Sequence, residues 1–351
     1  MLIEKIKIYI QIFLTIFLIY FYFDNSKYLS IYIIEGLYIC YSIVIPSLFL
    51  FIVFTCYISN FEFIKILGYP FIPVFKLLKI ENKEIISYCI LSILGGFATG
   101  GYFLSKIKKE YTCNDNMIGV LSILSSNNSP AFVICAVGIN MLGNYYSGIL
   151  LYCSILLSSF ITAFIFSFIF KYNSPKPSKS TTVTPHNFVN SLNSSVMSII
   201  YICGAVVFAY STCKAISLYT QKPAIYLIFS LFSEVTSSCK IIIDLYGKNI
   251  YMMCIALSIC PLSTCLQLKS YGDISLKILL ISKLVHIPLS LFILRVAVNL
   301  FPQTFMVYSS GDITVAPYWN APQISCWLFI ISICFVIFFD KKIKVFTNTD
   351  K

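Results

Sequence analysis

Apolar runs of about 20 residues, the length of a helix that crosses a bilayer, follow one another along most of the chain. Short polar or charged segments separate them. The pattern predicts an all-α, polytopic membrane protein with about eight transmembrane helices. The candidate spans are residues 7–23, 36–59, 117–140, 148–170, 190–213, 249–268, 278–298 and 323–339.

Two further apolar stretches, residues 84–105 and 223–243, are interrupted near their centres by polar and small residues. Each is either a broken span or a re-entrant hairpin that enters and leaves on one side. If both are re-entrant and the N-terminus is cytoplasmic, most lysines lie inside, as the positive-inside rule requires. Those are Lys65, Lys76, Lys79, Lys83, Lys106, Lys108, Lys109, Lys171, Lys176, Lys179, Lys269, Lys277, Lys341, Lys342, Lys344 and Lys351. We therefore predict two re-entrant hairpins and cytoplasmic N- and C-termini.

Composition narrows the functional class. The chain of 351 residues is 58% hydrophobic and 11% charged, so a soluble domain of this length is excluded. Its net charge of +11 lies in loops that face an anionic leaflet, and no compact basic domain for nucleic acid is present. The 14 cysteines include no CxxC pair, and with two histidines a metal site is not expected. No nucleotide-binding or nucleophile–base signature occurs, so we expect neither an enzyme nor a bound cofactor.

The two halves of the chain present the same order of segments: a span, an interrupted hairpin, a span with a polar break and an intact span. Each unit crosses the membrane an odd number of times, so the second must be inverted relative to the first. Coincidental alternation is the alternative. An inverted repeat with discontinuous helices is typical of secondary transporters that bind substrate near the midplane. The predicted units are an N-terminal transmembrane helix (1–30), a first repeat (31–170), a cytoplasmic linker (171–187), a second repeat (188–300), and an extracytoplasmic loop with a C-terminal transmembrane helix and basic tail (301–351).

The candidate site residues of the first half lie at its two interruptions. The segment "SSNNSPAFVICAVG" places Ser126, Asn127, Asn128 and Ser129 inside an apolar span, where non-helical backbone is tolerated only within protein or beside water. Ser129 can cap a half-helix that starts at Pro130, with its N-terminal dipole facing an anion. The asparagines can donate and accept hydrogen bonds to a ligand. The hairpin tip "GGFATGG", with Gly96, Thr99 and Gly100, suits close approach of backbone to a ligand. A structural kink is the alternative.

The second half offers charged candidates. Glu234, at the tip "SEVTSS", is the carboxylate expected deep in the membrane, where it would couple an ion, carry a proton or contact substrate. An ion pair with Lys240 or Lys283 is the structural alternative. The break "CPLSTCLQ" contributes Ser263, Thr264 and Gln267. Lys283 and His286 are three residues apart, hence on one helix face, and could meet a carboxylate; Lys283 could instead snorkel to the interface.

The motifs "FSEVTSSCKII", "PLSTCLQLKS" and "KLVH", with "GGFATGG" and "SSNNSPAFVICAVG" before them, resemble the nucleoside-recognition (Gate) domain. The two-repeat arrangement is similar to that of YlbJ-type (SpoVV) sporulation integral membrane proteins over roughly residues 36–300. The resemblance implies an architecture similar to concentrative nucleoside transporters and a role in moving dipicolinic acid out of the mother cell during endospore formation. It also implies that Thr236 acts with Glu234. Gly96-Phe97-Ala98 and Cys265 depart from the family pattern.

These observations predict a secondary transporter of a small planar polar anion, with dipicolinate as the best single candidate. A cation-coupled carrier of nucleosides or nucleobases and a non-transporting scaffold for spore assembly are the alternatives. The coupling ion, H⁺ or Na⁺, and the oligomeric state, including a homo-oligomer, stay open. The expected location is the outer forespore membrane or the cell membrane of a spore-forming bacterium.

Overall fold

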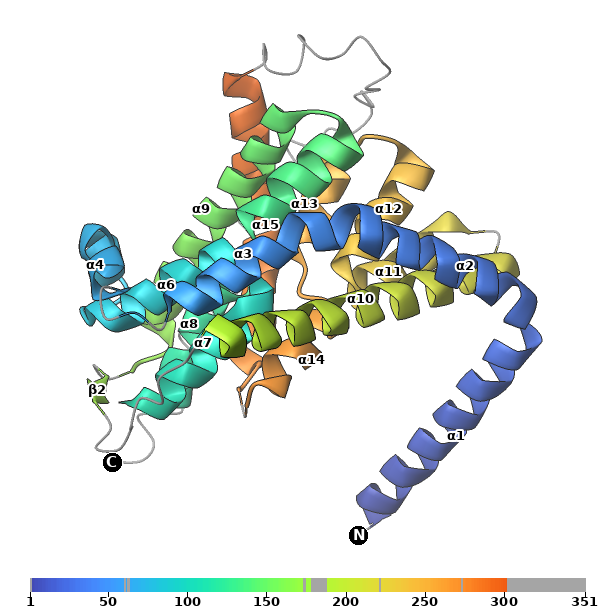
Figure 1. The fold of residues 1–351 in the computed structure, drawn as a ribbon, viewed down its shortest axis with the longest axis horizontal. Helices are drawn as coiled ribbons and strands as arrows, with labels where there is room; N and C mark the ends of the chain where they lie inside the picture. The colour runs from blue at the N-terminus through green and yellow to red at the C-terminus, as the bar shows by residue number, and fades with distance from the viewer. Residues whose placement is uncertain are drawn as a thin grey trace.

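Helices make up nearly all of the structure. The computed structural model describes residues 2–59, 61, 64–172, 175–177, 188–220, 222–272 and 274–301 (Figure 1). The elements of the first half are α1 (Leu2–Asp24), α2 (Ser26–Ile39), the π-helix η1 (Cys40–Val44), α3 (Ile45–Ile58), α4 (Ile64–Gly68), the 3₁₀-helix η2 (Tyr69–Phe71), α5 (Ile72–Lys76), α6 (Lys83–Gly95), α7 (Phe97–Glu110), β1 (Tyr111–Thr112), α8 (Asp115–Ser125), the π-helix η3 (Ala131–Leu142) and α9 (Tyr145–Ile169). Those that follow are β2 (Lys176–Pro177), α10 (Phe188–Tyr219), α11 (Pro223–Ser233), α12 (Val235–Tyr246), α13 (Ile250–Ser258), α14 (Leu262–Ser270) and α15 (Lys277–Leu300).

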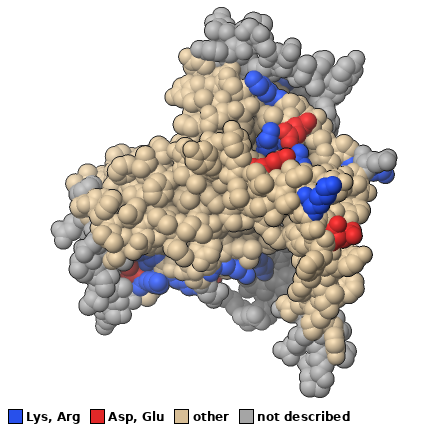
Figure 2. Space-filling view, turned by 45° about the vertical axis from the view of Figure 1, so that its right-hand side comes forward, with Lys and Arg blue, Asp and Glu red and all other residues tan. Residues whose placement is uncertain are grey.

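Five helical segments in the described residues are long and apolar enough to cross a membrane. They are Ser26–Ile58, Tyr145–Ile169, Phe188–Tyr219, Ile250–Ser270 and Lys277–Leu300. The chain is therefore an all-helical, multi-pass membrane protein, as the apolar runs predict. The space-filling view agrees, because a broad uncharged surface separates two groups of charged side chains (Figure 2).

Several predicted spans differ in detail from the observed helices. The span expected at 36–59 begins ten residues earlier, at Ser26, because α2, η1 and α3 form one continuous helical segment. The span expected at 117–140 is instead two shorter helices, α8 and η3, which end at Ser125 and resume at Ala131. Residues 64–76, between two predicted spans, form the short helices α4, η2 and α5. The predicted C-terminal span, 323–339, lies outside the described residues.

Polar side chains at the helix starts explain several boundaries. Asn114 accepts a hydrogen bond from the backbone N–H of Met117 and caps α8, and Asn249 caps α13 by accepting from the N–H groups of Tyr251 and Met252. Asn82 and Asn144 cap α6 and α9 in the same way. The first half of each broken helix thus begins at an asparagine.

The helix pairs of the two halves pack in matching ways. Helix α3 packs on α6 and α10 on α11, while α6 packs on α7 and α11 on α12. Helix α7 contacts α14 from the other half, and α12 contacts η3. Likewise α8 contacts both α9 and α15, and α13 contacts the same two helices. In Figure 1 α3 and α10 lie side by side across the molecule, whereas α1 projects away from the other helices.

The described residues 171–172 and 175–177 contact the chain both before α6 and after α7. The Tyr172 hydroxyl donates to the carbonyl oxygen of Leu78, which precedes α6. Strand β2 pairs with β1, which directly follows α7. The Asn116 amide also donates to the carbonyl oxygen of Lys171 at 3.1 Å. Both ends of the α6–α7 pair therefore lie against the same segment of chain.

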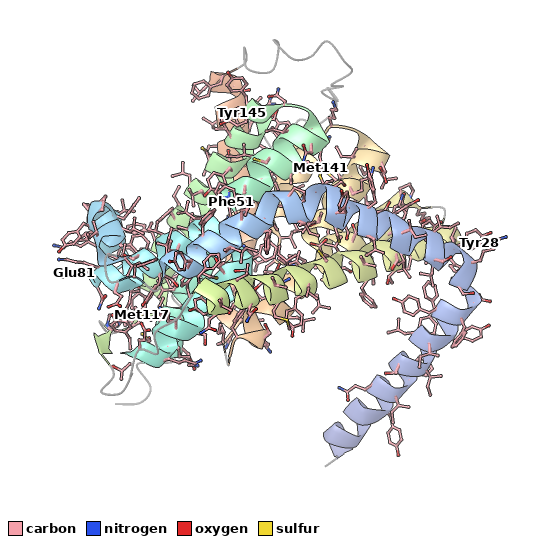
Figure 3. The ribbon with its side chains drawn as sticks, in the orientation of Figure 1. Tyr28, Phe51, Glu81, Met117, Met141 and Tyr145 are labelled. Carbon is pink, nitrogen blue, oxygen red and sulfur yellow. The ribbon has the colours of Figure 1, made fainter. Side chains whose placement is uncertain are left out.

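Buried apolar side chains form two clusters in the described structure. One cluster includes Ile52 of α3, Val137 of η3 and residues of α10 to α13. The other includes Leu121 of α8, Phe166 of α9 and residues of α4 to α7. Figure 3 shows Met117, at the start of α8, and Met141, near the end of η3, at the two ends of the broken helix that joins the clusters.

A polar layer lies where the chain passes from one apolar cluster to the other. Helices α9 and α15, the α8–η3 pair and the α13–α14 pair each contribute apolar residues to both clusters. Between those contributions, each segment carries buried polar residues: Ser158 and Ser159 on α9, His286 on α15, Ser125 to Ser129, and Ser258. A buried polar layer between two apolar layers marks a site or a hydrogen-bonded seam within the membrane protein.

Candidate functional site

The break in the first half lies between Ser125 and Ala131. The Ser129 hydroxyl accepts a hydrogen bond from the backbone N–H of Phe132 at 3.1 Å, so the predicted cap of the second half-helix is confirmed. That half-helix, η3, has π geometry, which is rare and is frequently found at functional sites. All five residues from Ser125 to Ser129 are buried. The described conformation is therefore closed around the break.

The amide nitrogens of Asn127 and Asn128 are already used within the protein. Asn127 donates to the Leu124 carbonyl at 3.0 Å and to the Ser159 hydroxyl at 2.9 Å. Asn128 donates at 2.8 Å to the carbonyl of Leu257, in the last turn of α13. That carbonyl has no partner within its own helix, because the last four carbonyls of any helix lack one. Asn128 thus joins the break of the first half to the break of the second.

The side-chain oxygens of Asn127 and Asn128 accept no hydrogen bond from the described residues. Asn127 Oδ1, Asn128 Oδ1 and Ser125 Oγ are buried and have no hydrogen-bond partner among the described residues. Buried polar atoms without partners are rare in folded proteins and call for an explanation. Asn127 uses both of its amide N–H groups within the protein, whereas Asn128 uses one of its two. The unpartnered oxygens are available as acceptors, and the ligand contacts expected of both asparagines stay predictions.

The glycines of the first hairpin tip make room for the first break. Gly96 has φ +74° and ends α6, and a Cβ added there would lie 2.6 Å from the backbone nitrogen of Ser129. A Cβ on Gly100 would lie 1.9 Å from the carbonyl oxygen of Ser125. Thr99, also buried, donates to the Gly96 carbonyl at 3.2 Å. The close backbone approach predicted for this tip is therefore made to the break itself.

Glu234 lies at the second hairpin tip and is 2% exposed. Its Oε2 atom accepts from the Ser237 backbone N–H at 2.7 Å and from the Ser237 hydroxyl at 3.0 Å, which caps α12. Thr236, which precedes Ser237 in the first turn of α12, is also buried. Lys240 pairs instead with Asp244 at 2.8 Å, and Lys283 makes no contact with Glu234. The ion pair considered from the sequence is therefore wrong, and among the described residues Glu234 has no paired cation.

The second break spans Ile259 to Pro261 and brings Lys283 beside two thiols. Lys283 is 7% exposed, so it does not snorkel to the interface. The two thiols are those of Cys260 and Cys265, whose sulfurs lie 3.6 Å apart. Thr264 is buried, Ser263 is half-buried, and the side-chain oxygen of Gln267 is buried without a partner among the described residues.

His286 contacts both halves of the chain. Its Nδ1 atom lies 3.3 Å from the Ser258 carbonyl at the end of α13, and its Nε2 atom lies 3.2 Å from the Ile155 carbonyl of α9. The imidazole is buried, so both ring nitrogens face protein carbonyls. In this conformation His286 positions α13 and α9, and Lys283 lies one turn earlier on α15.

The predicted residues therefore fall into two groups. Direct contacts join Gly96 to Ser129, Asn128 to Leu257 and His286 to Ser258, so the first hairpin tip, the two breaks and α15 meet. Glu234 and Thr236 lie apart from these contacts, at the start of α12, where the Ser237 hydroxyl contacts both the Glu234 carboxylate and the Val206 carbonyl of α10. Ser159, Ser258 and Ser290, which hydrogen-bond within the polar layer, are not predicted from the sequence. The serine pair at 158–159 within an apolar span was the available signal.

Replacing Asn128 tests the link between the breaks. Asn128→Ala leaves the Leu257 carbonyl buried without a donor, and we expect a loss of about 1–3 kcal/mol in the free energy of unfolding. The measurement is thermal denaturation of the purified protein in detergent. Asn140→Ala is the matched control, because Asn140 lies on η3 with an exposed side chain. Equal midpoints for the two variants would show that the Asn128 bond contributes nothing.

No family model, curated protein or solved structure that was compared with this chain matches it.

Proposed function

We propose that this protein is a secondary transporter of a small planar polar anion, with dipicolinic acid leaving the mother cell of a spore-forming bacterium as the best candidate substrate. The observation that carries the proposal is the meeting of two helix breaks, joined by the bond from Asn128 to the Leu257 carbonyl, inside a polar layer between two apolar clusters. Irregular backbone at membrane depth lines the substrate site in transporters of this kind. The resemblance to the Gate domain motivates the substrate.

The proposed architecture is an inverted repeat of about eight transmembrane helices and two re-entrant hairpins. The α6–α7 and α11–α12 pairs are the hairpins, and the α8–η3 and α13–α14 pairs are the broken helices. The matching contacts of the two halves support this arrangement. The contacts of residues 171–177 with both ends of the α6–α7 pair support a hairpin that enters and leaves on one side. With the lysines as predicted, both termini are cytoplasmic.

Lys283 and the half-helix termini would face the carboxylates of the anion, while Ser and Gln side chains contact the ring edge. Glu234 would couple transport to H⁺ or Na⁺ movement. Because the first break is buried in this conformation, substrate entry requires the hairpins to move relative to α9 and α15. The chemistry is binding and translocation, without an enzymatic step, and the bilayer is the working environment.

Uptake into vesicles tests the proposal. Purified protein is reconstituted into liposomes, and accumulation of labelled dipicolinate is measured under imposed H⁺ and Na⁺ gradients. We expect accumulation above that of protein-free vesicles, with competition by unlabelled dipicolinate. If neither dipicolinate nor any nucleoside accumulates under either gradient, the protein is not a carrier of this class.

A cation-coupled nucleoside carrier is the second candidate. The unpartnered oxygens of Asn127, Asn128 and Gln267 accept hydrogen bonds, and nucleosides present N–H and O–H donors that dipicolinate dianion lacks. Competition separates the two: inhibition of uptake by uridine or adenosine, but not by dipicolinate, would favour this candidate. A cysteine-labelling experiment distinguishes a transporter from the non-transporting scaffold. A Ser126→Cys variant should react with a water-soluble thiol reagent only if the protein is a transporter that exposes this position to water.

A further inference from the structure

Two thiols lie in contact at the second helix break. Cys260 Sγ is 3.6 Å from Cys265 Sγ, close enough for one thiol to donate a hydrogen bond to the other. Cys260 is in the segment that precedes α14, and Cys265 is in the first turn of that helix. The sequence spacing is five residues, so no CxxC pattern marks the pair. Its proximity arises from the turn at Pro261.

The backbone already holds these residues in a closed turn. The Cys265 N–H donates to the Pro261 carbonyl at 3.1 Å, which fixes the first turn of α14 beside the preceding segment. A disulfide requires sulfur atoms about 2.05 Å apart. The two sulfurs therefore need to approach by about 1.5 Å, a movement that the proposal assigns to rotation of the two side chains about χ1.

Lys283 supplies the charge that favours reaction of these thiols. Lys283 is buried one turn before His286, whose ring lies against the Ser258 carbonyl next to this break, and a cation near a thiol stabilises the thiolate, which is the reactive form. Cys265 is half-buried whereas Cys260 is buried, so Cys265 is the sulfur that a small oxidant reaches first. The environment is electropositive and partly accessible, as at reactive cysteines.

We propose that Cys260 and Cys265 form an oxidisable dithiol that hydrogen peroxide converts into an intramolecular disulfide across the second helix break. The Cys265 thiolate attacks one peroxide oxygen, the O–O bond breaks, and sulfenic acid and water form. The Cys260 sulfur then attacks the Cys265 sulfur and displaces hydroxide, which leaves as a second water after protonation. In total, two thiols lose two protons and two electrons to one peroxide molecule, which becomes two waters.

The disulfide would close a ring around Pro261, Leu262, Ser263 and Thr264. These residues include two of the predicted ligand contacts. Fixing them removes freedom from the break, so oxidation would slow any transport cycle in which the second half-helix moves. This consequence rests on the proposed function, whereas formation of the disulfide does not.

Peptide mass spectrometry tests the dithiol directly. Membranes containing the full chain are treated with hydrogen peroxide, free thiols are blocked with N-ethylmaleimide, and the protein is digested with trypsin. One peptide, residues 249–269, carries Cys254, Cys260 and Cys265. We expect the oxidised peptide to carry one maleimide, on Cys254. Its mass should be lower by two hydrogen atoms than that of the same peptide with Cys260 and Cys265 as free thiols. Without peroxide, or after dithiothreitol, Cys260 and Cys265 regain their labels.

Two variants make the outcome decisive. Cys265→Ser abolishes the disulfide, whereas Cys135→Ser, at an exposed position of η3, leaves it unchanged. Lys283→Met lowers the rate of disulfide formation by roughly tenfold, because the thiolate loses its neighbouring cation. Labelling of Cys260 and Cys265 that peroxide does not reduce would overturn the proposal. A disulfide that forms in a protein that transports nothing would refute the proposed function alone.

Discussion

Gly100→Ala should prevent the protein from reaching its folded state. The added Cβ would lie 1.9 Å from the Ser125 carbonyl oxygen and 2.9 Å from the Ser125 carbonyl carbon. Both are backbone atoms at the end of α8, so relief requires α7 and α8 to separate. Overpacking typically lowers the free energy of unfolding by about 1–3 kcal/mol, and a backbone clash this close lies at or above the top of that range. We expect little monodisperse protein in size-exclusion chromatography of detergent extracts.

Gly204→Ala is the matched control for this result. Gly204 is also helical, on α10, and no heavy atom lies within 4 Å of the Cβ it would gain. Alanine favours a helix interior over glycine by about 0.5–1 kcal/mol, so the variant should melt at or above the wild-type temperature. A Gly100→Ala protein as stable as Gly204→Ala would mean that the hairpin tip and the first break are not in contact.

The positions of the helix breaks are predictable from sequence because the signal is local. A proline next to hydrogen-bonding side chains, as at Ser129-Pro130, interrupts an apolar run within a few residues. Gly96 and Glu234 likewise stand at the points where α6 and α11 end. The multi-pass helical class follows from the apolar runs and is confirmed. The domain boundaries, the orientation of the termini and the substrate stay predictions.

Contacts between segments that are distant in the chain could not be predicted from the sequence. Asn128 finds its acceptor at Leu257, in the other half of the chain, and nothing near Asn128 specifies a carbonyl there. The sequence predicts the asparagines as ligand contacts, whereas in the structure their amide nitrogens donate hydrogen bonds to other groups of the protein. The contact between Cys260 and Cys265 also has no sequence signal, because the turn at Pro261 brings together two thiols that are five residues apart.

Glu234→Gln should abolish transport while leaving the fold intact. The carboxylate Oε2 accepts from the Ser237 N–H and hydroxyl, and an amide oxygen in the same place accepts both bonds. The cap of α12 therefore survives, and the melting temperature should stay close to that of the wild type. Glutamine cannot bind or release a proton or supply a negative charge, so ion-coupled uptake should fall to the level of protein-free vesicles.

Comparison with Glu234→Ala distinguishes the role of Glu234 as the N-cap of α12 from its proposed role in coupling transport to an ion. Alanine removes the acceptor of both Ser237 bonds, and loss of an N-cap lowers stability by about 1 kcal/mol. This variant should therefore lose both thermal stability and transport, whereas Glu234→Gln loses transport alone. A Glu234→Gln protein with wild-type uptake would reduce this carboxylate to a helix cap, and coupling would then have to reside elsewhere. That outcome would be informative because Glu234 is buried and has no paired cation among the described residues. A neutral side chain could cap α12 equally well, so capping alone does not require a carboxylate at this position.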